Sequence, residues 1–307
     1  MIAHWDDVQA VRLEKGHMCG TWTDLGEAAG SQHIGVNRIQ IDPGRWSTPV
    51  HRELDAEEIF FMLAGSGLSW HDGKTYEIGP GDCIVYRVAE EHTLRAGDEG
   101  LDVLAFGERI IARYTHFPRT NVIGNYPGVT VDVSQGPRAW DREVEAGEPE
   151  LPEASPRPAN IVNVDDVAGE YDGRWKRLAA EAGSVRTGLN LASQGPGEDG
   201  ADPHCHSADE EIFVVLAGSG RIELWPAPLR AAHGAEREEH PIHAGHVISR
   251  PPGTGIGHYL VAGDEGMTYL AYGTRRPDDV CYYPRANQIY FRGLGLLTEL
   301  PPVAPEE

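Results

Sequence analysis

Four residues in the second half of the chain have the types and spacing of a metal site. His204 and His206 lie two positions apart, and Glu211 and His258 follow downstream. Alternate side chains of a strand share a face, so both leading imidazoles are expected to point the same way. The letters "SAD" before Glu210 predict a turn, after which Glu211 begins a new strand. Three neutral imidazoles and one carboxylate favour a transition metal over Mg²⁺ or Ca²⁺, which prefer oxygen ligands. The predicted cofactor is one divalent transition metal (Fe, Mn, Ni, Co, Zn or Cu), with positions left for water, substrate or dioxygen.

A similar stretch in the first half carries a changed version of this set. His51, Glu58 and His92 match ligand positions of the second half, but Glu53 stands where the second copy has His206. In one interpretation, two imidazoles and two carboxylates hold a divalent ion whose charge the carboxylates neutralise.

In the other interpretation, the first-half site has lost its metal. Glu53 or Glu58 would then pair with Arg52 or Arg87, and Arg87 stands where the second copy has Pro251. We expect loss or weak occupancy. The candidates for this second, weaker metal site are His51, Glu53, Glu58 and His92.

Both stretches belong to a repeat that covers most of the chain. Gly20–Trp22 recurs as Gly173–Trp175 at an offset of 153 residues, and Gly97–Arg109 recurs as Gly263–Arg275 at an offset of 166. The extra residues fall mostly in the loop 226–240. A period this long indicates two duplicated domains, and the Pro- and Glu-rich segment between them is typical of an extended, solvated linker. The predicted organisation is a first domain at 1–141, a linker at 142–160 and a second domain at 161–307.

The composition indicates a protein of short strands and turns. The 307 residues include 37 glycines and 22 prolines, and short apolar runs alternate with turn signals. In each copy the letters "AGSG" follow such a run and predict a hairpin. Short helices are expected only near residues 24–29 and 175–182. This pattern favours an antiparallel sandwich or barrel.

Charge and segment composition limit the partners and the location. The formal net charge of −22 argues against nucleic acids and anionic membranes, because both would repel the protein. The N-terminal residues lack the basic start and apolar core of a signal peptide, and no apolar run is long enough to span a bilayer. We therefore expect a cytoplasmic protein with a small-molecule substrate, and we leave open whether it forms a homo-oligomer.

The second-half residues resemble the motifs of the cupin superfamily. The pattern H-x-H-x4-E-x6-G, at His204, His206, Glu211 and Gly218, is similar to the first cupin motif. With the duplication, the chain resembles a bicupin. This resemblance implies an all-β fold of two double-stranded β-helix (jelly-roll) barrels, with the metal inside the second barrel.

The second cupin motif, G-x5-P-x-G-x2-H, is similar to a pattern later in the same half. Its residues are Gly245, Pro251, Gly253 and His258. Four residues separate Gly253 from His258, where the family usually has two. This departure puts the local turn in doubt more than the ligand.

The resemblance implies several functions. We favour a metal-dependent enzyme acting on a small organic substrate, most specifically a dioxygenase-like oxidoreductase; the alternatives are a cupin isomerase and a non-catalytic metal- or metabolite-binding protein. Bicupin oxalate decarboxylases have an arginine just before the first metal histidine, whereas this chain has Asp202-Pro203, which argues against oxalate. The candidate substrate-binding residues are Arg186, for an anionic group, and Phe213, Val215 and Tyr259, for an apolar one.

Overall fold

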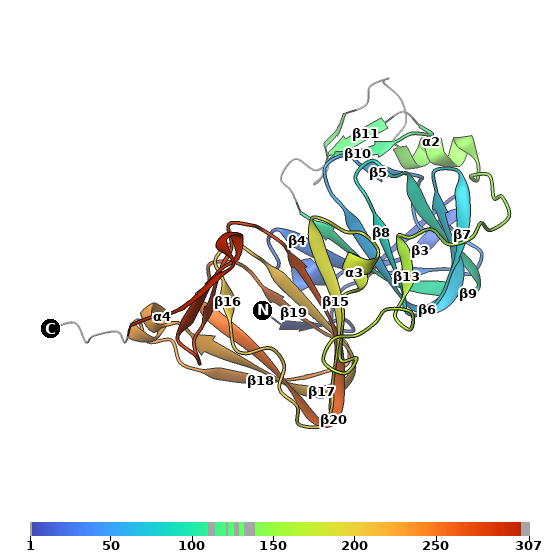
Figure 1. The fold of residues 1–307 in the computed structure, drawn as a ribbon. Helices are drawn as coiled ribbons and strands as arrows, with labels where there is room; N and C mark the ends of the chain where they lie inside the picture. Colours follow the sequence, from blue (N-terminus) through green and yellow to red (C-terminus); the bar gives the residue numbers. More distant parts are fainter. Residues whose placement is uncertain (1, 110–113, 121, 126–128, 132–138, 302–307) are drawn as a thin grey trace.

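The chain folds into two β-barrels that lie against each other (Figure 1). The computed structural model describes residues 2–109, 114–120, 122–125, 129–131 and 139–301. In each half, one large and one small antiparallel sheet form the barrel. The prediction of an all-β fold with two jelly-roll barrels is confirmed. Within the described part of the chain, no helix has the length and apolar character needed to cross a bilayer.

The first barrel combines an eight-stranded sheet with a four-stranded sheet. The large sheet has the order β13-β8-β6-β9-β4-β3-β2, with β7 beside β6, and the small sheet has the order β12-β11-β10-β5. The strands are β2 Val11–Lys15, β3 Met18–Asp24, β4 Ile34–Ile41, β5 Arg52–Glu53, β6 Glu58–His71, β7 Lys74–Ile78, β8 Asp82–Tyr86, β9 His92–Glu108, β10 Tyr114–Phe117, β11 Val122–Asn125, β12 Val129–Val131 and β13 Ile161–Asn163.

The second barrel combines a seven-stranded sheet with a four-stranded sheet. The large sheet has the order β1-β19-β17-β20-β15-β14, with β18 beside β17, and the small sheet has the order β16-β21-β22-β23. The strands are β1 Ile2–His4, β14 Trp175–Lys176, β15 Thr187–Gln194, β16 Cys205–His206, β17 Glu211–Pro226, β18 Glu238–His243, β19 His246–Arg250, β20 Ile256–Thr274, β21 Val280–Tyr283, β22 Gln288–Phe291 and β23 Leu296–Glu299.

The helices are short and lie outside the sheets. Two of them, α1 and α3, fall where the sequence predicts helices, whereas α2 and α4 were not predicted. The helical segments are α1 Leu25–Ala28, α2 Ala139–Ala146, α3 Leu178–Glu181, α4 Pro228–Ala232 and the 3₁₀ turn Arg292–Leu294.

The segment between the copies is mostly exposed, as its composition suggests, but it is attached to the first barrel. Its first residues belong to α2, and the following residues are bonded to the first barrel. The indole N–H of Trp70 donates to the carbonyl of Glu150, and the Thr75 hydroxyl donates to the carbonyl of Pro152. The limits 1–141, 142–160 and 161–307 stay a prediction, and the connecting segment packs as part of the first barrel.

The "AGSG" segments do not form the predicted hairpins. Strand β6 continues through the first of them, with a shift of its register against β9 between Gly65 and Gly67. Gly65 has φ +79°, and a Cβ there would lie 2.2 Å from the carbonyl oxygen of Gly100. Glycine is therefore required for a β-bulge inside a long strand, and the sequence signal marks this bulge instead of a chain reversal.

The two halves exchange their first strands. Strand β1 pairs with β19 of the second barrel, with Ile2 opposite Ile248, and β13 pairs with β8 of the first barrel, with Ile161 opposite Ile84. The two exchanged segments read "IAHWDDV" and "IVNVDDV". The duplication therefore produces a reciprocal contact in which each repeat supplies an edge strand to the other.

An apolar core joins the barrels. One cluster of buried side chains includes Leu25 and Phe106 from the first half together with Leu178 and Tyr272 from the second. The rings of Phe106 and Tyr272 have centroids 5.0 Å apart. Separate clusters fill the interior of each barrel. The strands that carry the candidate site therefore pack against one apolar cluster between the barrels and another inside the second barrel.

Two buried glutamates, Glu57 and Glu210, connect the barrels by hydrogen bonds, and we call this pair the interdomain clamp. Glu210 accepts hydrogen bonds from the backbone N–H groups of Gln32, at 2.8 Å, and His33, at 2.5 Å. At the equivalent place in the other half, Glu57 accepts from the N–H of Arg186 at 3.1 Å and from the hydroxyl of Ser184 at 2.7 Å. Each glutamate directly precedes the candidate ligand Glu58 or Glu211 in the sequence.

Candidate metal centre

Short strand segments bring the four candidate ligands of the second barrel together. His206 ends β16, Glu211 begins β17 and His258 lies near the start of β20. His204 precedes β16 and pairs with His258 through two backbone hydrogen bonds, at 3.2 and 2.9 Å. The turn between His206 and Glu211 allows the carboxylate to face the imidazoles, as the sequence predicts.

The three imidazoles surround one carboxylate oxygen. Oε2 of Glu211 lies 2.9 Å from Nε2 of His258, 3.3 Å from Nε2 of His206 and 3.7 Å from Nε2 of His204. Oε2 of Glu211 and Nε2 of His206 and of His258 are buried and have no hydrogen-bond partner among the described residues. Buried polar atoms without partners are costly, and a divalent cation between them would satisfy all of them at once. The donor set therefore fits a transition metal.

The charges around the ligand set are strongly coupled. Burial and the neighbouring His204 lower the pKa of His258 to about 3. Burial opposes the charge on His206, but the carboxylates of Glu211 and Asp279 raise its pKa to about 10. Despite burial, the imidazoles hold the pKa of Glu211 well below its usual value. Positive charge is therefore favoured between the carboxylates of Glu211 and Asp279. A metal ion bound to the imidazoles would supply positive charge in this region.

Asp279 orients one ligand, and the sequence analysis did not find it. Its Oδ2 lies 2.7 Å from Nδ1 of His206, and its Oδ1 accepts from the backbone N–H groups of Ala208 and Asp209. Asp279 is 1 % exposed, and despite burial its bonds with His206 and the backbone lower its pKa. A carboxylate behind a histidine fixes the tautomer of the ring and makes the other nitrogen a better ligand.

Replacing Asp279 with Asn should weaken metal binding while leaving the four ligands in place. An amide can still accept from the backbone but does not stabilise the proton on Nδ1 of His206. Loss of such a partner typically costs 10- to 100-fold in metal affinity, so we expect a fall of about 30-fold. Competition with a chromophoric chelator measures the change, and Asp278→Asn, at the exposed neighbour, is the control. An unchanged affinity in Asp279→Asn would contradict the orienting role.

A cavity of about 270 Å³ opens beside the ligand set. His204, His206, Glu211 and His258 all line it. Its other walls are mainly aromatic: Trp175, Phe213, Tyr259, Tyr269, Tyr283 and Tyr290.

The candidate substrate residues fall into two groups. Phe213 and Tyr259 line the cavity. Val215 is fully buried in the apolar core of the barrel. Arg186 lies at the contact between the barrels, where its Nε is 2.7 Å from the Glu108 carboxylate. Arg186 therefore does not line the cavity of the second barrel, and its guanidinium is held by a carboxylate of the first half.

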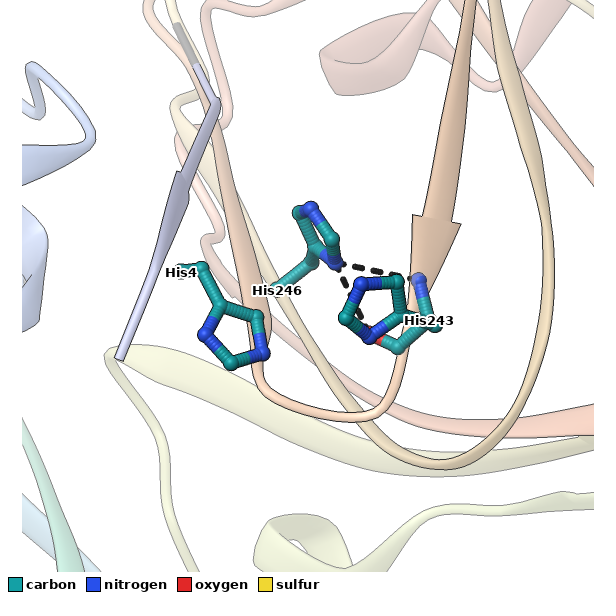
Figure 2. Close-up of side chains that lie close together, drawn as sticks. All are labelled: His4, His243 and His246. Atoms are coloured by element: carbon teal, nitrogen blue, oxygen red, sulfur yellow. Dashed lines mark hydrogen bonds between the residues drawn. The ribbon is translucent and has the colours of Figure 1, made fainter. Parts of the chain in front are cut away.

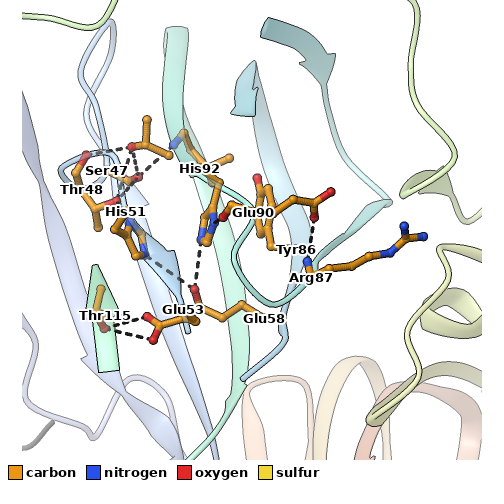
Figure 3. Close-up of polar contacts among 12 residues, drawn as sticks. Ser47, Thr48, His51, Glu53, Glu58, Tyr86, Arg87, Glu90, His92 and Thr115 are labelled. Carbon is orange, nitrogen blue, oxygen red and sulfur yellow. Dashed lines mark hydrogen bonds and ion pairs between the residues drawn. The ribbon is translucent and has the colours of Figure 1, made fainter. Parts of the chain in front are cut away.

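The first barrel brings together a smaller set of potential metal ligands (Figure 3). Oε2 of Glu58 lies 3.0 Å from Nε2 of His92 and 3.6 Å from Nε2 of His51. The ring of Tyr86 stacks on His92 with centroids 3.9 Å apart. Potential ligand atoms of His51, Glu58 and His92 lie within 4.8 Å of one another, so three of the four predicted residues meet.

Glu53 is directed to a different partner. Both of its carboxylate oxygens accept from the Thr115 hydroxyl, at 2.9 and 3.0 Å, and the side chain is buried. Arg52 donates to Nδ1 of His116. The side chain of Arg87 extends away from the ligand set in Figure 3. The first barrel therefore offers two imidazoles and one carboxylate in place of three and one.

A Glu53→His variant should gain metal in the first barrel, but with lower affinity than the second barrel shows. The new imidazole would occupy the position of His206. The residue at the sequence position equivalent to Asp279 is Arg113, which lies outside the described residues and cannot orient the ring as a carboxylate would. We expect about one additional Co²⁺ per chain, with an affinity at least about tenfold weaker. Glu53→Gln is the control, and an unchanged Co²⁺ stoichiometry in Glu53→His would contradict the prediction.

Comparison with known proteins identifies the fold of both barrels. Residues 37–106 match the family model described as a cupin domain. A structure of Bacillus subtilis oxalate decarboxylase, studied for its Mn(II) centres, has a TM-score of 0.62 and 17% identity, covering 91% of this chain and 78% of that chain. The first barrel therefore contains a match to a cupin domain, and both barrels share the jelly-roll fold of these structures. The expected resemblance to a bicupin is thereby confirmed.

A second structure and the curated proteins complete the comparison. The formate complex of Lactobacillus farciminis oxalate decarboxylase has a TM-score of 0.60 and 16% identity, covering 90% of this chain and 86% of that chain. No curated protein matches the chain. At this identity the similarity establishes the fold, whereas the ligands, the location in the cell and the oligomeric state stay predictions.

Proposed function

We propose that the second barrel is the active centre of a metal-dependent enzyme acting on a small organic substrate. The observation that carries this proposal is the convergence of three imidazole nitrogens and one carboxylate oxygen beside a cavity. His204, His206, Glu211 and His258 would hold the metal. When bound, a divalent ion at such a site supplies a Lewis acid for substrate oxygens and, if redox-active, a means of activating dioxygen.

The cavity walls support a partly apolar substrate. Phe213 and Tyr259 offer aromatic surface against which a planar group can pack. Arg292 is the one arginine among the described residues of the wall, and it pairs with Asp209 and lies 3.7 Å from Asp279. The positive charge of Arg292, which a small dianionic substrate would need, is therefore already neutralised by these carboxylates. This favours a dioxygenase-like oxidoreductase that consumes dioxygen together with an aromatic or 1,3-dicarbonyl substrate.

The residues of the site have separate parts in this proposal. Asp279 keeps the proton on Nδ1 of His206, so that Nε2 faces the metal position. His204 is fixed by the contact of its Nδ1 with the carbonyl of Asp202, at 2.7 Å. The aromatic wall excludes water and restricts the orientation of the bound substrate.

Oxalate decarboxylation is the second candidate function, because the similar structures come from oxalate decarboxylases. Two features of the second barrel argue against this function. Pro203 stands immediately before His204, where those enzymes are expected to carry an arginine, and Arg292 is already paired. An isomerase or a non-catalytic binding protein remains the alternative if no turnover is found.

Identification of the bound metal and a substrate panel together test the proposal. The purified full chain would be analysed for metal and then assayed for oxygen uptake with catechols, flavonols and 1,3-diketones, and for formate release from oxalate. Oxygen uptake that disappears in Glu211→Ala supports the dioxygenase. Formate release without net oxygen uptake favours the decarboxylase, and no turnover with Fe, Mn, Ni, Co or Cu favours an isomerase or binding protein.

A further inference from the structure

Three histidines from distant parts of the chain meet on the outside of the second barrel (Figure 2). His4 ends β1, His243 ends β18 and His246 begins β19. The ring centroids of His4 lie 5.0 Å from those of His243 and of His246, and the last two are 4.3 Å apart. One potential ligand nitrogen from each ring lies within 4.8 Å of the others. The cluster lies outside the cavity of the proposed active centre.

The first barrel contains the same turn without any of these histidines. Because β13 pairs with β8 as β1 pairs with β19, Asn163, Gly79 and Asp82 occupy the three positions there. The Asn163 amide donates to the carbonyl of Pro80 at 3.1 Å, and the N–H of Gly79 donates to Asp82 at 2.7 Å. The turn thus forms with an amide, a glycine and a carboxylate. Its backbone geometry does not explain three imidazoles at the equivalent positions.

Backbone contacts orient the rings. Nε2 of His4 and Nδ1 of His243 each lie 3.0 Å from the carbonyl oxygen of Ala244. Nδ1 of His246 lies 3.0 Å from the N–H of His243, from which it can accept, and 3.0 Å from the carbonyl oxygen of His243, to which it can donate. In the tautomer that donates to the carbonyl, Nε2 has a free lone pair for a metal. Metal-bound histidines commonly donate their second N–H to a backbone carbonyl in this way. With this tautomer the ligand atoms would be Nε2 of His243 and of His246 together with Nδ1 of His4. Nδ1 of His4 accepts from the backbone N–H of Asp6 at 3.3 Å, a contact that an ion would replace, and lies 3.7 Å from the Asp6 carboxylate.

We infer that His4, His243 and His246 form a second, external site for one borderline divalent cation such as Zn²⁺. Imidazole ligands select Zn, Ni, Cu and Co over Mg and Ca. With Zn–N bonds of about 2.1 Å, nitrogens of a tetrahedral site lie about 3.4 Å apart, so small ring rotations close the site from its present spacing. His243 is exposed and has room for such a rotation.

The ion would link β1 to β18 and β19 of the second barrel, because the three ligands lie at the ends of these strands. His4 and the hairpin carbonyl that it contacts are 240 residues apart in the sequence. Metal binding at ligands this distant stabilises the folded state, because the unfolded chain cannot preform the site. The site would therefore reinforce the exchange of β1 between the halves, independently of the reaction in the second barrel.

Zn²⁺ titration of the tag-free full chain tests the inference. The titration would be done in the Glu211→Ala background, so that the active centre does not contribute, with a chromophoric chelator as competitor. The variants His4→Asn and His243→Gly carry the residues that the first barrel uses at these positions, so both should fold. Each is expected to bind one fewer Zn²⁺ per chain than the background protein. Co²⁺ in the background protein should show the visible absorption of a nitrogen-ligated site, and both variants should lack it.

His233→Ala is the matched control, because His233 is exposed and lies in the nearby inserted loop 226–240, outside the cluster. It should keep the full Zn²⁺ stoichiometry and the Co²⁺ absorption. Equal stoichiometry in the background protein, His4→Asn and His243→Gly would overturn the inference. A rise in Tm with Zn²⁺ that persists in His243→Gly would also contradict it. Failure of the proposed reaction in the second barrel would leave these results unaffected.

Discussion

Glu211→Ala is expected to remove tightly bound metal from the second barrel and to abolish turnover. Oε2 of Glu211 is the atom on which the imidazoles of His206 and His258 converge, at 3.3 and 2.9 Å. Without it, the site loses its one negative ligand and the charge that balances a divalent ion. The affinity should fall by more than the roughly 100-fold that loss of an orienting partner can cost. Elemental analysis after dialysis and competition with a chelator measure the change.

The duplicated chain provides a matched control for this variant. Glu58 begins β6 of the first barrel as Glu211 begins β17 of the second, and it faces two imidazoles in place of three. Glu58→Ala should leave the tightly bound metal and the turnover of the second barrel unchanged. Circular dichroism should show both variants folded. If Glu58→Ala loses the metal and Glu211→Ala keeps it, the active centre lies in the first barrel and the proposed function is wrong.

Three members of the ligand set could be predicted because they lie close together in the sequence, and His258 could be predicted through its resemblance to the second cupin motif. The alternation within His204-Cys205-His206 and the turn before Glu211 are local features, and each imposes a direction on its side chain. Asp279 is 73 residues from His206 and has no motif of its own. Its role depends on the pairing of β16 with β21, which only the folded sheet determines. The sequence therefore reveals the candidate ligands but not the residues that orient them.

Long-range pairing also explains the other differences between prediction and structure. Arg186 sits on a strand-like run and was a reasonable candidate for an anionic substrate, but the packing of one barrel on the other places it beside Glu108. The repeated first strands are visible in the sequence, yet nothing local indicates that β1 and β13 pair with the opposite barrels. Edge strands have unpaired backbone groups, and their partner is set by which sheet lies nearest.

Removing the interdomain clamp should produce the largest loss of stability of any single polar substitution considered. Glu210 is fully buried and accepts from two backbone N–H groups of the first half, those of Gln32 and His33. Hydrogen bonds to a charged acceptor contribute about 1.5–3 kcal/mol each, so Glu210→Ala is expected to lower the free energy of unfolding by about 3 kcal/mol. Urea unfolding of the metal-free protein measures this, because without metal the neighbouring Glu211 does not contribute through binding.

Because the clamp contains two equivalent glutamates, the same prediction can be tested with a second variant and with the double variant. Glu57 makes the corresponding bonds to Ser184 and Arg186, so Glu57→Ala should lower the stability by a similar amount. Glu265→Ala, at an exposed position of β20, should change the free energy of unfolding by less than about 0.5 kcal/mol. Because both glutamates hold the same contact, the double variant should lose less than the sum of the single losses once the barrels separate. Full additivity would indicate that each glutamate stabilises only its own loop and that the barrels are joined by the apolar core alone.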